Sequence, residues 1–129
     1  MYDDYDPRLY CKMYVDADDI SQMELHSHLV RCLGDRVNSV GQRSIDGALF
    51  SIDVMRNEDF DSVRRKEPDG FVYFRYYLDV DAVPGQQLAE QVALVTQILE
   101  CFWAQGYAAV AAADFEDELP HRGGYNPDR

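Results

Sequence analysis

Two long runs in which apolar and polar residues alternate, each followed by a helical pattern, limit the folds open to this chain more than any other feature. The first run covers residues 9–16 and the second covers residues 71–81. Alternation with a period of two is typical of a strand that buries one face. Because a helix after each strand can cover that face, the two units predict a single layered domain.

The first helix is expected to begin at a capping box and to end at a glycine. Ser21 and Glu24 have the spacing at which both side chains accept hydrogen bonds from the free amides at a helix start. Gly34 follows, and glycine readily takes the left-handed conformation that ends helices. The sequence therefore predicts a helix over residues 22–33, with His26 inside its apolar arc as a partly buried structural residue.

The second helix is expected to open after Pro84-Gly85 and to stop at Gly106. Its apolar residues recur at helical spacing and form one stripe, with Trp103 at the edge. The residues of this stripe are Leu88, Val92, Val95, Leu99 and Phe102.

Shorter segments complete the pattern. Residues 37–44 and 48–56 predict two strands joined by a turn at 45–47, and residues 107–113 predict a short final strand. The polar segment 57–70 predicts a long surface loop.

The order strand, helix, strands, strand, helix, strand predicts an α+β fold of the ferredoxin-like type. In this two-layer sandwich an antiparallel sheet carries both helices on one face and gains an extra hairpin strand. The strands at 9–16 and 71–81 are then expected to be adjacent, parallel and central. We expect one domain over residues 1–129, with a flexible N-terminus at 1–7 and an acidic, then Pro/Gly-rich, tail at 114–129.

The charge of the chain excludes several classes of partner. The 129 residues include 12 Lys and Arg against 24 Asp and Glu, a formal net charge of −12. Such a field repels phosphates, so we expect neither nucleic acid nor an anionic membrane as a partner. With 47% hydrophobic and 12% aromatic residues, the chain has enough apolar side chains for a core, which argues against global disorder.

The cysteines and the N-terminus predict a soluble protein of the cytoplasm. No apolar run is long enough to cross a membrane, and the acidic N-terminus is unlike a secretory signal. Cys11, Cys32 and Cys101 have no metal-ligand spacing and are odd in number, so we expect free thiols in a reducing compartment.

No complete catalytic signature occurs in the chain. The sequence contains no G-x-S-x-G turn, no phosphate-binding glycine loop and no paired histidines of the zinc-protease kind. We therefore expect a non-enzymatic protein that uses no cofactor.

An acidic edge of the sheet offers an enzymatic alternative. In the expected parallel arrangement the ends of the two central strands bring residues 16–19 near Asp79 and Asp81. Carboxylates are the ligands that Mg²⁺ and Ca²⁺ prefer, so this edge is a candidate metal site. Its candidate ligands are Asp16, Asp18, Asp79 and Asp81. The loop lacks EF-hand spacing, and a solvated acidic rim beside a helix start explains the same residues.

The sheet face away from the helices is expected to carry aromatic and basic side chains. The set comprises Tyr10, Lys12, Tyr14, Tyr73, Arg75 and Tyr77. Tyr and Arg are enriched in the centres of protein interfaces, so Tyr73, Arg75 and Tyr77 are candidate partner-binding residues. A homodimer formed through this face is an alternative.

A run of carboxylates follows the last strand. The run and its apolar neighbours are Asp114, Phe115, Glu116, Asp117, Glu118 and Leu119. Charged and apolar side chains together predict a surface that receives a basic partner and anchors it by apolar contacts. Two other interpretations stay open: a solvated tail, or an intramolecular partner for the basic residues 64–66, which the expected topology places at the same end of the sheet.

In its small size, its acidity and its α+β layout the chain resembles the immunity proteins that bacteria encode beside polymorphic or contact-dependent toxins. The segment from Trp103 through Gly106 to residues 114–120 is part of this resemblance. The resemblance implies a stoichiometric inhibitor that blocks the active site of a toxin or a surface beside it. Many such toxins are basic nucleases, whose groove an acidic protein mimics electrostatically. We therefore expect a protein-binding module for a basic partner, with a metal-dependent enzyme and a homo-oligomer subunit as alternatives.

Overall fold

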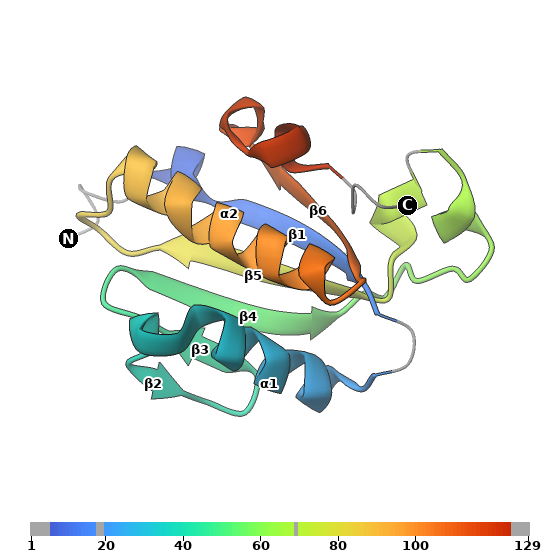
Figure 1. Ribbon diagram of the computed structural model, residues 1–129, viewed down its shortest axis with the longest axis horizontal. Coiled ribbons are helices and arrows are strands. Elements are labelled where there is room, and N and C mark those ends of the chain that lie inside the picture. The colour runs from blue at the N-terminus through green and yellow to red at the C-terminus, as the bar shows by residue number, and fades with distance from the viewer. Residues whose placement is uncertain (1–5, 18–19, 69, 125–129) are drawn as a thin grey trace.

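A computed structural model of the chain shows a six-stranded sheet with two helices packed on one face (Figure 1). The structure describes residues 6–17, 20–68 and 70–124. The predicted α+β class and two-layer arrangement are confirmed. We call the opposite face of the sheet, which carries neither helix, the open face.

The strands are β1 (Cys11–Asp16), β2 (Ser39–Val40), β3 (Ser44–Asp46), β4 (Phe50–Arg56), β5 (Tyr76–Ala82) and β6 (Ala108–Ala113). The helices are α1 (Gln22–Leu33) and α2 (Leu88–Ala104). Short 3₁₀ turns lie between and beyond them: η1 (Pro7–Leu9), η2 (Gly34–Arg36), η3 (Arg64–Lys66), η4 (Gly70–Tyr73), η5 (Glu116–Glu118) and η6 (Pro120–Gly123).

The strands follow the order β2-β3-β4-β5-β1-β6, and every neighbouring pair is antiparallel. β1 and β5 are adjacent inside the sheet, as predicted, but the prediction that they are parallel is wrong. The reason is one additional reversal of the chain. The sequence predicts a single strand over residues 37–44, whereas the hairpin β2-β3 begins there and makes β5 run in the opposite direction.

The last elements form a split β-α-β unit. β5 and β6 are both antiparallel to β1, which lies between them, so they are parallel to each other and α2 connects them. The register pairs Lys12 with Asp79 of β5 and with Ala112 of β6. Because neighbours in register share a face, this pairing decides which side chains meet on the open face.

The two reversals around β3 differ from the predicted turn. The chain turns at residues 41–43 and again at 47–49, while Ile45, predicted in a turn, is fully buried in β3. A Cβ at Gly47 would overlap the ring of Phe50 and lie 2.7 Å from the Arg36 carbonyl oxygen, so the second turn requires glycine. The sequence thus correctly predicts a turn at Gly47, but it assigns to that turn two residues, 45 and 46, that belong to β3.

Helix α1 has the predicted bounds and both predicted ends. The Ser21 hydroxyl accepts a hydrogen bond from the Glu24 amide at 3.1 Å, and the Glu24 carboxylate accepts one from the Ser21 amide at 3.2 Å. Gly34 ends the helix with a φ of 54°. His26 is buried and one of its ring nitrogens lies 3.1 Å from the Ser44 carbonyl oxygen, which confirms the predicted structural role.

Helix α2 lies where the sequence predicts it, but its buried face is partly different. Leu88 is 44% exposed at the helix start, although the sequence places it in the apolar stripe. Gln91, which is not part of the predicted stripe, is fully buried, and its side-chain amide donates to the Leu9 carbonyl at 2.9 Å. Over the described residues, neither helix has the length and apolar character needed to span a membrane.

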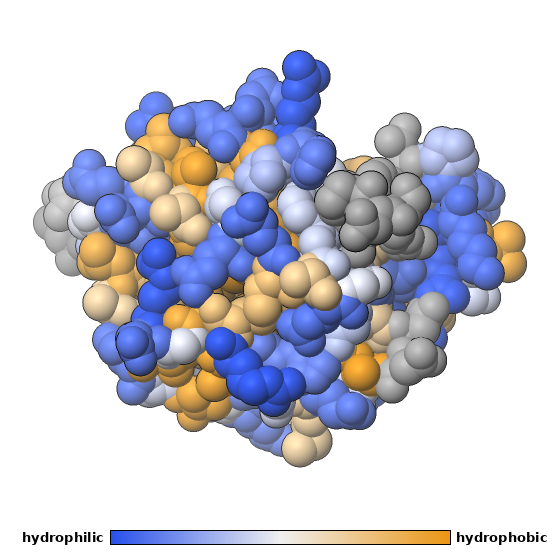
Figure 2. Space-filling model, viewed as in Figure 1, coloured by the Kyte–Doolittle hydropathy of each residue, from blue (hydrophilic) through white to orange (hydrophobic). Residues whose placement is uncertain are grey.

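The core lies between the helices and the sheet, and every long element contributes to it. Its large, fully buried side chains include Met13, Leu25, Leu29, Ile52, Leu78, Ile98 and Phe102. Burying a side chain of this size stabilises the fold by about 1.5–3 kcal/mol. Figure 2 shows that hydrophilic residues interrupt the hydrophobic ones over the helix-bearing face, so the apolar surface is gathered mainly inside.

The segment before β5 folds over one half of the open face. The sequence predicts a strand from residue 71, whereas η4 occupies residues 70–73. The Asn57 side chain donates to the carbonyl oxygens of Val72 and Phe74, both at 2.8 Å, and so holds the turn in place. Phe74 then packs against Ala108 and Val110 in a small second core. A local side-chain hydrogen bond and a second apolar cluster thus replace the first part of the predicted strand.

The C-terminal segment is packed against the fold as far as residue 124, so its description as a solvated tail is wrong. Phe115 and Leu119 are 4% and 5% exposed and belong to the main core. His121 and Arg122 have φ angles of 53° and 54°, unusual for residues other than glycine. These left-handed residues bring Gly123 against the edge of the sheet, where it is buried.

The end of α2 and the C-terminal segment together cover the outer edge of β6. The indole of Trp103 in α2 donates to the Ala109 carbonyl at 3.1 Å. In the C-terminal segment, a Cβ at Gly123 would lie only 2.7 Å from the Ala111 carbonyl oxygen. An uncovered edge strand is a template for pairing with another chain. Both elements therefore protect an edge that consists almost entirely of alanine.

A disulfide bond joins Cys32 of α1 to Cys101 of α2, so the prediction of free thiols is wrong at these two positions. The sequence contains no spacing signal for this pair, because the two cysteines meet only when the helices pack side by side. Cys11 is free and buried, as predicted, and burial raises the pKa of its thiol to about 12.

Candidate protein-binding surface

The predicted acidic run forms a fixed surface at the end of β6. Asp114, Glu116, Asp117 and Glu118 are exposed, while the side chain of Phe115 points into the core between them. Glu116 also accepts a hydrogen bond from the Ala113 amide at 3.5 Å. The carboxylates therefore stand on a segment whose backbone is anchored on both sides.

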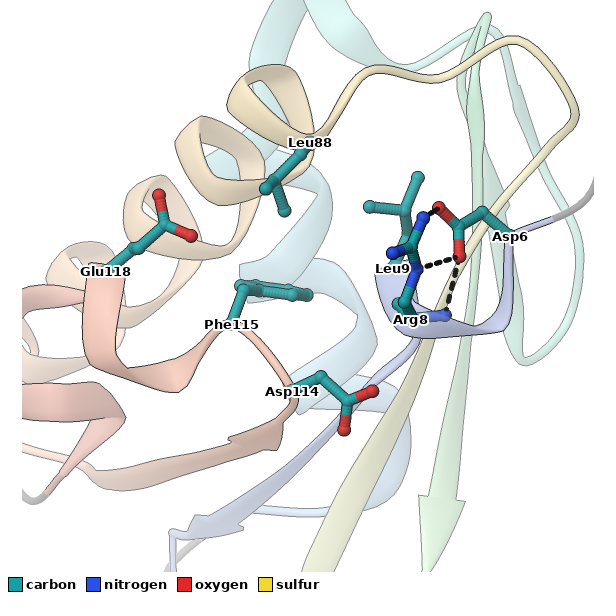
Figure 3. A pocket seen from close by; sticks show the side chains of 7 residues that line it. All are labelled: Asp6, Arg8, Leu9, Leu88, Asp114, Phe115 and Glu118. Carbon is teal, nitrogen blue, oxygen red and sulfur yellow. Dashed lines mark hydrogen bonds and ion pairs between the residues drawn. The ribbon is translucent and has the colours of Figure 1, made fainter.

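A cavity of about 220 Å³ opens beside this surface, between η1, the start of α2 and the acidic run (Figure 3). Apolar and charged side chains line it together: Asp6, Arg8, Leu9, Leu88, Asp114, Phe115 and Glu118. Leu88, which the core prediction misplaced, lines the cavity with Phe115. An apolar floor with carboxylates at the rim suits an amphipathic side chain such as Lys or Arg.

An ion pair within the chain lies at the rim of this cavity. The Arg8 guanidinium donates two hydrogen bonds of 3.0 Å to Asp6. The hydrogen bonds from the side chain and backbone of Arg8 lower the pKa of the Asp6 carboxyl, and those to Asp6 raise the pKa of Arg8. Asp114 also raises the pKa of Arg8 through its charge. Arg8 thus places one cation of the chain at this rim, held by its neighbour Asp6.

The basic run at η3 lies at the other end of the sheet from the acidic run. Arg65 pairs with Asp16 at 3.0 Å, at the end of β1, and both side chains are nearly buried. Ala113, directly before the acidic run, is instead paired with Cys11 at the start of β1. The alternative in which the two runs pair within the chain is therefore wrong.

The candidate metal site is also divided between the two ends. Because β1 and β5 are antiparallel, Asp16 lies near the start of β5, whereas Asp79 and Asp81 lie toward its end. Asp18 lies outside the described residues. Within the described part of the chain no group of three or more His, Cys, Asp or Glu side chains has a geometry that could hold a metal ion.

Of the three residues predicted to bind a partner on the open face, two lie outside the sheet. Tyr73 belongs to η4, with the Arg64 guanidinium 5.5 Å from the centre of its ring. Arg75 precedes β5, and its guanidinium lies 4.1 Å from the centre of the Phe60 ring. Tyr77 is on β5 and faces the open side. The three residues therefore do not form the continuous strip that the sequence predicts.

Acidic side chains lie on the part of the open face beyond the cluster around Phe74. One row of residues in register runs from β3 to β6 and consists of Ser44, Asp53, Asp79, Lys12 and Ala112. The Lys12 ammonium lies 4.3 Å from the centre of the Tyr77 ring and 5.1 Å from that of Tyr14. Tyr10 donates a hydrogen bond to Asp79. A single ammonium group thus sits among aromatic rings and carboxylates.

These carboxylates repel one another. Burial, Asp79 and Asp53 raise the pKa of the Asp81 carboxyl. Burial and the hydrogen bond to Asp79 raise the pKa of the Tyr10 hydroxyl. The shift at Asp81 means that burial and the two neighbouring carboxylates disfavour its charged form in the chain on its own.

Sequence reasoning missed the residues that complete both surfaces. Asp6, Arg8 and Leu88 line the cavity although they are far from residue 114 in sequence. Asp53 enters the open face because β4 lies beside β5. The alternation in β4 was a signal for Asp53, but only the strand order shows which carboxylate lies opposite it.

Comparisons of the chain with protein-family models, curated proteins and solved structures find no match. The chemistry of the two surfaces is therefore the basis for a functional proposal.

Proposed function

We propose that this protein is a non-enzymatic binding module for a basic protein partner. The observation that supports it most directly is the burial of Phe115 and Leu119, which holds the carboxylates of residues 114–118 at fixed positions beside a cavity. A solvated tail would have to lose conformational freedom on binding, whereas an anchored segment has already lost it.

The charge distribution supports fast and specific association. The chain carries a net charge of −12, and complementary charge steers a basic protein toward it. The cavity adds apolar contacts, which charge alone does not provide. A Lys or Arg side chain of the partner would place its apolar stem on Leu88 and Phe115 and its cationic end near Asp114 or Glu118.

The more specific form of the proposal is an immunity-like inhibitor that neutralises a toxin in a stoichiometric complex. Its support is the resemblance in size, acidity and layout together with the anchored acidic surface. Binding in a nuclease groove would use carboxylates in place of the phosphates of a substrate.

The disulfide bond bears on where such a complex would form. Disulfides persist in oxidising compartments and are rare in the cytoplasm. The cytoplasmic location expected from the sequence stays a prediction, and the Cys32–Cys101 bond weighs against it.

The proposal is tested by titrating the purified protein with the product of the adjacent reading frame. We expect a one-to-one complex that weakens steeply as salt is raised, because salt screens the charges. Asp114→Asn combined with Glu118→Gln should weaken binding by about tenfold, since both carboxylates line the cavity and each lost contact contributes up to about 1 kcal/mol.

The matched control is Asp35→Asn combined with Glu100→Gln, which removes the same charge from exposed positions elsewhere. It should change the affinity much less than the first pair of substitutions. Equal weakening by both pairs would show that only the total charge matters, and the absence of any complex would refute the proposal.

A further inference from the structure

A second surface, on the open face, has the composition of a binding site for cations. The helices cover the other face of the sheet (Figure 1), and within the described part of the chain the segment around Phe74 packs on the open face near the start of β5. On the half of the open face near the end of β5 lie Asp53, Asp79 and Asp81, with Lys12 and Tyr77 beside them. This half of the face is therefore both acidic and aromatic.

The arrangement of charge on this half is unfavourable for the isolated chain. Asp53 and Asp79 are directly opposite each other on β4 and β5, and like charges in this position destabilise a sheet. Among the described residues, neither Asp53 nor Asp81 takes part in an ion pair. Lys12, which is in register with Asp79, has its ammonium group over the rings of Tyr14 and Tyr77, and Asp79 accepts a hydrogen bond from Tyr10. Asp53 and Asp81 are therefore the carboxylates of this face that are open to a cation from outside.

We propose that this half of the open face docks an arginine-rich segment of a protein partner. The inference rests on the proposed function in that the partner is basic, and it adds a second docking surface to the acidic run. Lys12 already shows the chemistry within the chain, since its ammonium group lies over a tyrosine ring at 4.3 Å.

Arginine fits this surface better than other side chains. Its planar guanidinium group stacks on aromatic rings and forms paired hydrogen bonds with carboxylates. Asp53 is exposed and Asp81 half-buried, so both offer oxygen atoms to an incoming group. A guanidinium placed between them would offset the repulsion that raises the pKa of Asp81.

The test uses a nona-arginine peptide and amide NMR spectra of the ¹⁵N-labelled protein at low salt. We expect the largest shift changes at Lys12, Asp53, Tyr77, Asp79 and Asp81. A nona-lysine peptide should bind about fivefold more weakly, because ammonium groups lack the planar stacking and paired donors worth about 1 kcal/mol.

Two variants with equal charge separate this surface from the bulk charge. Asp53→Asn combined with Asp81→Asn should weaken nona-arginine binding by about fivefold. Asp35→Asn combined with Glu100→Gln should leave it nearly unchanged. Equal weakening by both pairs would overturn the inference.

The outcomes also distinguish this inference from the proposed function. Shift changes confined to residues 114–118 would overturn the open-face site and leave the acidic run as the binding surface. Loss of open-face signals on raising the protein concentration alone would show a second copy as the occupant, and would also overturn it. Binding at the open face together with no complex in the partner titration would support this inference while refuting the proposed function.

Discussion

At the scale of single residues, Gln91 and Asp81 differ in whether the chain compensates for the burial of a polar group. Gln91 is fully buried, but its amide donates to the Leu9 carbonyl and so joins α2 to the start of β1. Asp81 has no such compensation, because burial and two neighbouring carboxylates all disfavour its charge. The first is a structural polar group, whereas the second is one that a cationic partner would stabilise.

Asp81→Asn should therefore raise the free energy of unfolding at neutral pH, by up to about 1 kcal/mol for relief of like-charge neighbours. The folded-state pKa of Asp81 lies above the ordinary value of 3.8, so the folded wild type gains stability as pH falls through it. The advantage of the variant should shrink over the same range and vanish below the ordinary pKa. Urea unfolding of both proteins at several pH values measures the difference in their free energies of unfolding. Asp35→Asn, at an exposed position, is the control.

Gly123→Ala should destabilise the protein by about 1–3 kcal/mol. The residue has a φ of 75°, and a Cβ would lie 2.7 Å from the Ala111 carbonyl oxygen. Gly85→Ala is the matched control, because Gly85 also has a positive φ, of 101°, but its Cβ would meet open space. Urea unfolding of both variants should show the larger loss at Gly123; equal losses would mean that only the backbone conformation matters there.

At the scale of secondary structure elements, local signals located the helices well and the short strands poorly. α1 has its predicted bounds because its capping box and terminal glycine act within one or two turns of the chain. The hairpin β2-β3 was missed because β2 has only two residues and both are exposed. A strand this short has no alternation to detect, yet it reverses the direction of everything that follows.

The disulfide is the strongest covalent link between elements. Reduction, or Cys32→Ser combined with Cys101→Ser, should lower the free energy of unfolding by about 4 kcal/mol, the value expected for a loop closed across 69 residues. Unfolding in denaturant with and without a reductant measures the loss. The double variant should not respond to the reductant; a wild type that does not respond either would contradict the bond.

At the scale of the whole molecule, two acidic surfaces lie at one end of the sheet. The acidic run follows β6 beside the start of β1, and Asp81 lies near the end of β5 at the same end. The basic residues of η3 are at the other end, where Arg65 is paired with Asp16. A basic partner would therefore approach the molecule from a defined direction.

Because the net charge is −12, the folded state should be more stable at moderate than at low salt. Screening reduces repulsion among carboxylates that folding brings together. Thermal unfolding between about 10 and 150 mM salt should show a rising midpoint, across the range in which the screening length falls from about 30 to 8 Å. Removing four charges with Asp114→Asn, Glu116→Gln, Asp117→Asn and Glu118→Gln should flatten this dependence. A midpoint that falls with salt would contradict it.

The α+β class, the two helices and the acidic character of the last segment follow from periodicity, capping and composition, which are local properties of the chain. The direction of β5, the Cys32–Cys101 bond, the burial of Phe115 and the pairing of Asp53 with Asp79 depend instead on how the elements pack. Each of these joins residues far apart in the chain. Their contacts depend on the number of chain reversals and on strand order, which no short window of sequence contains.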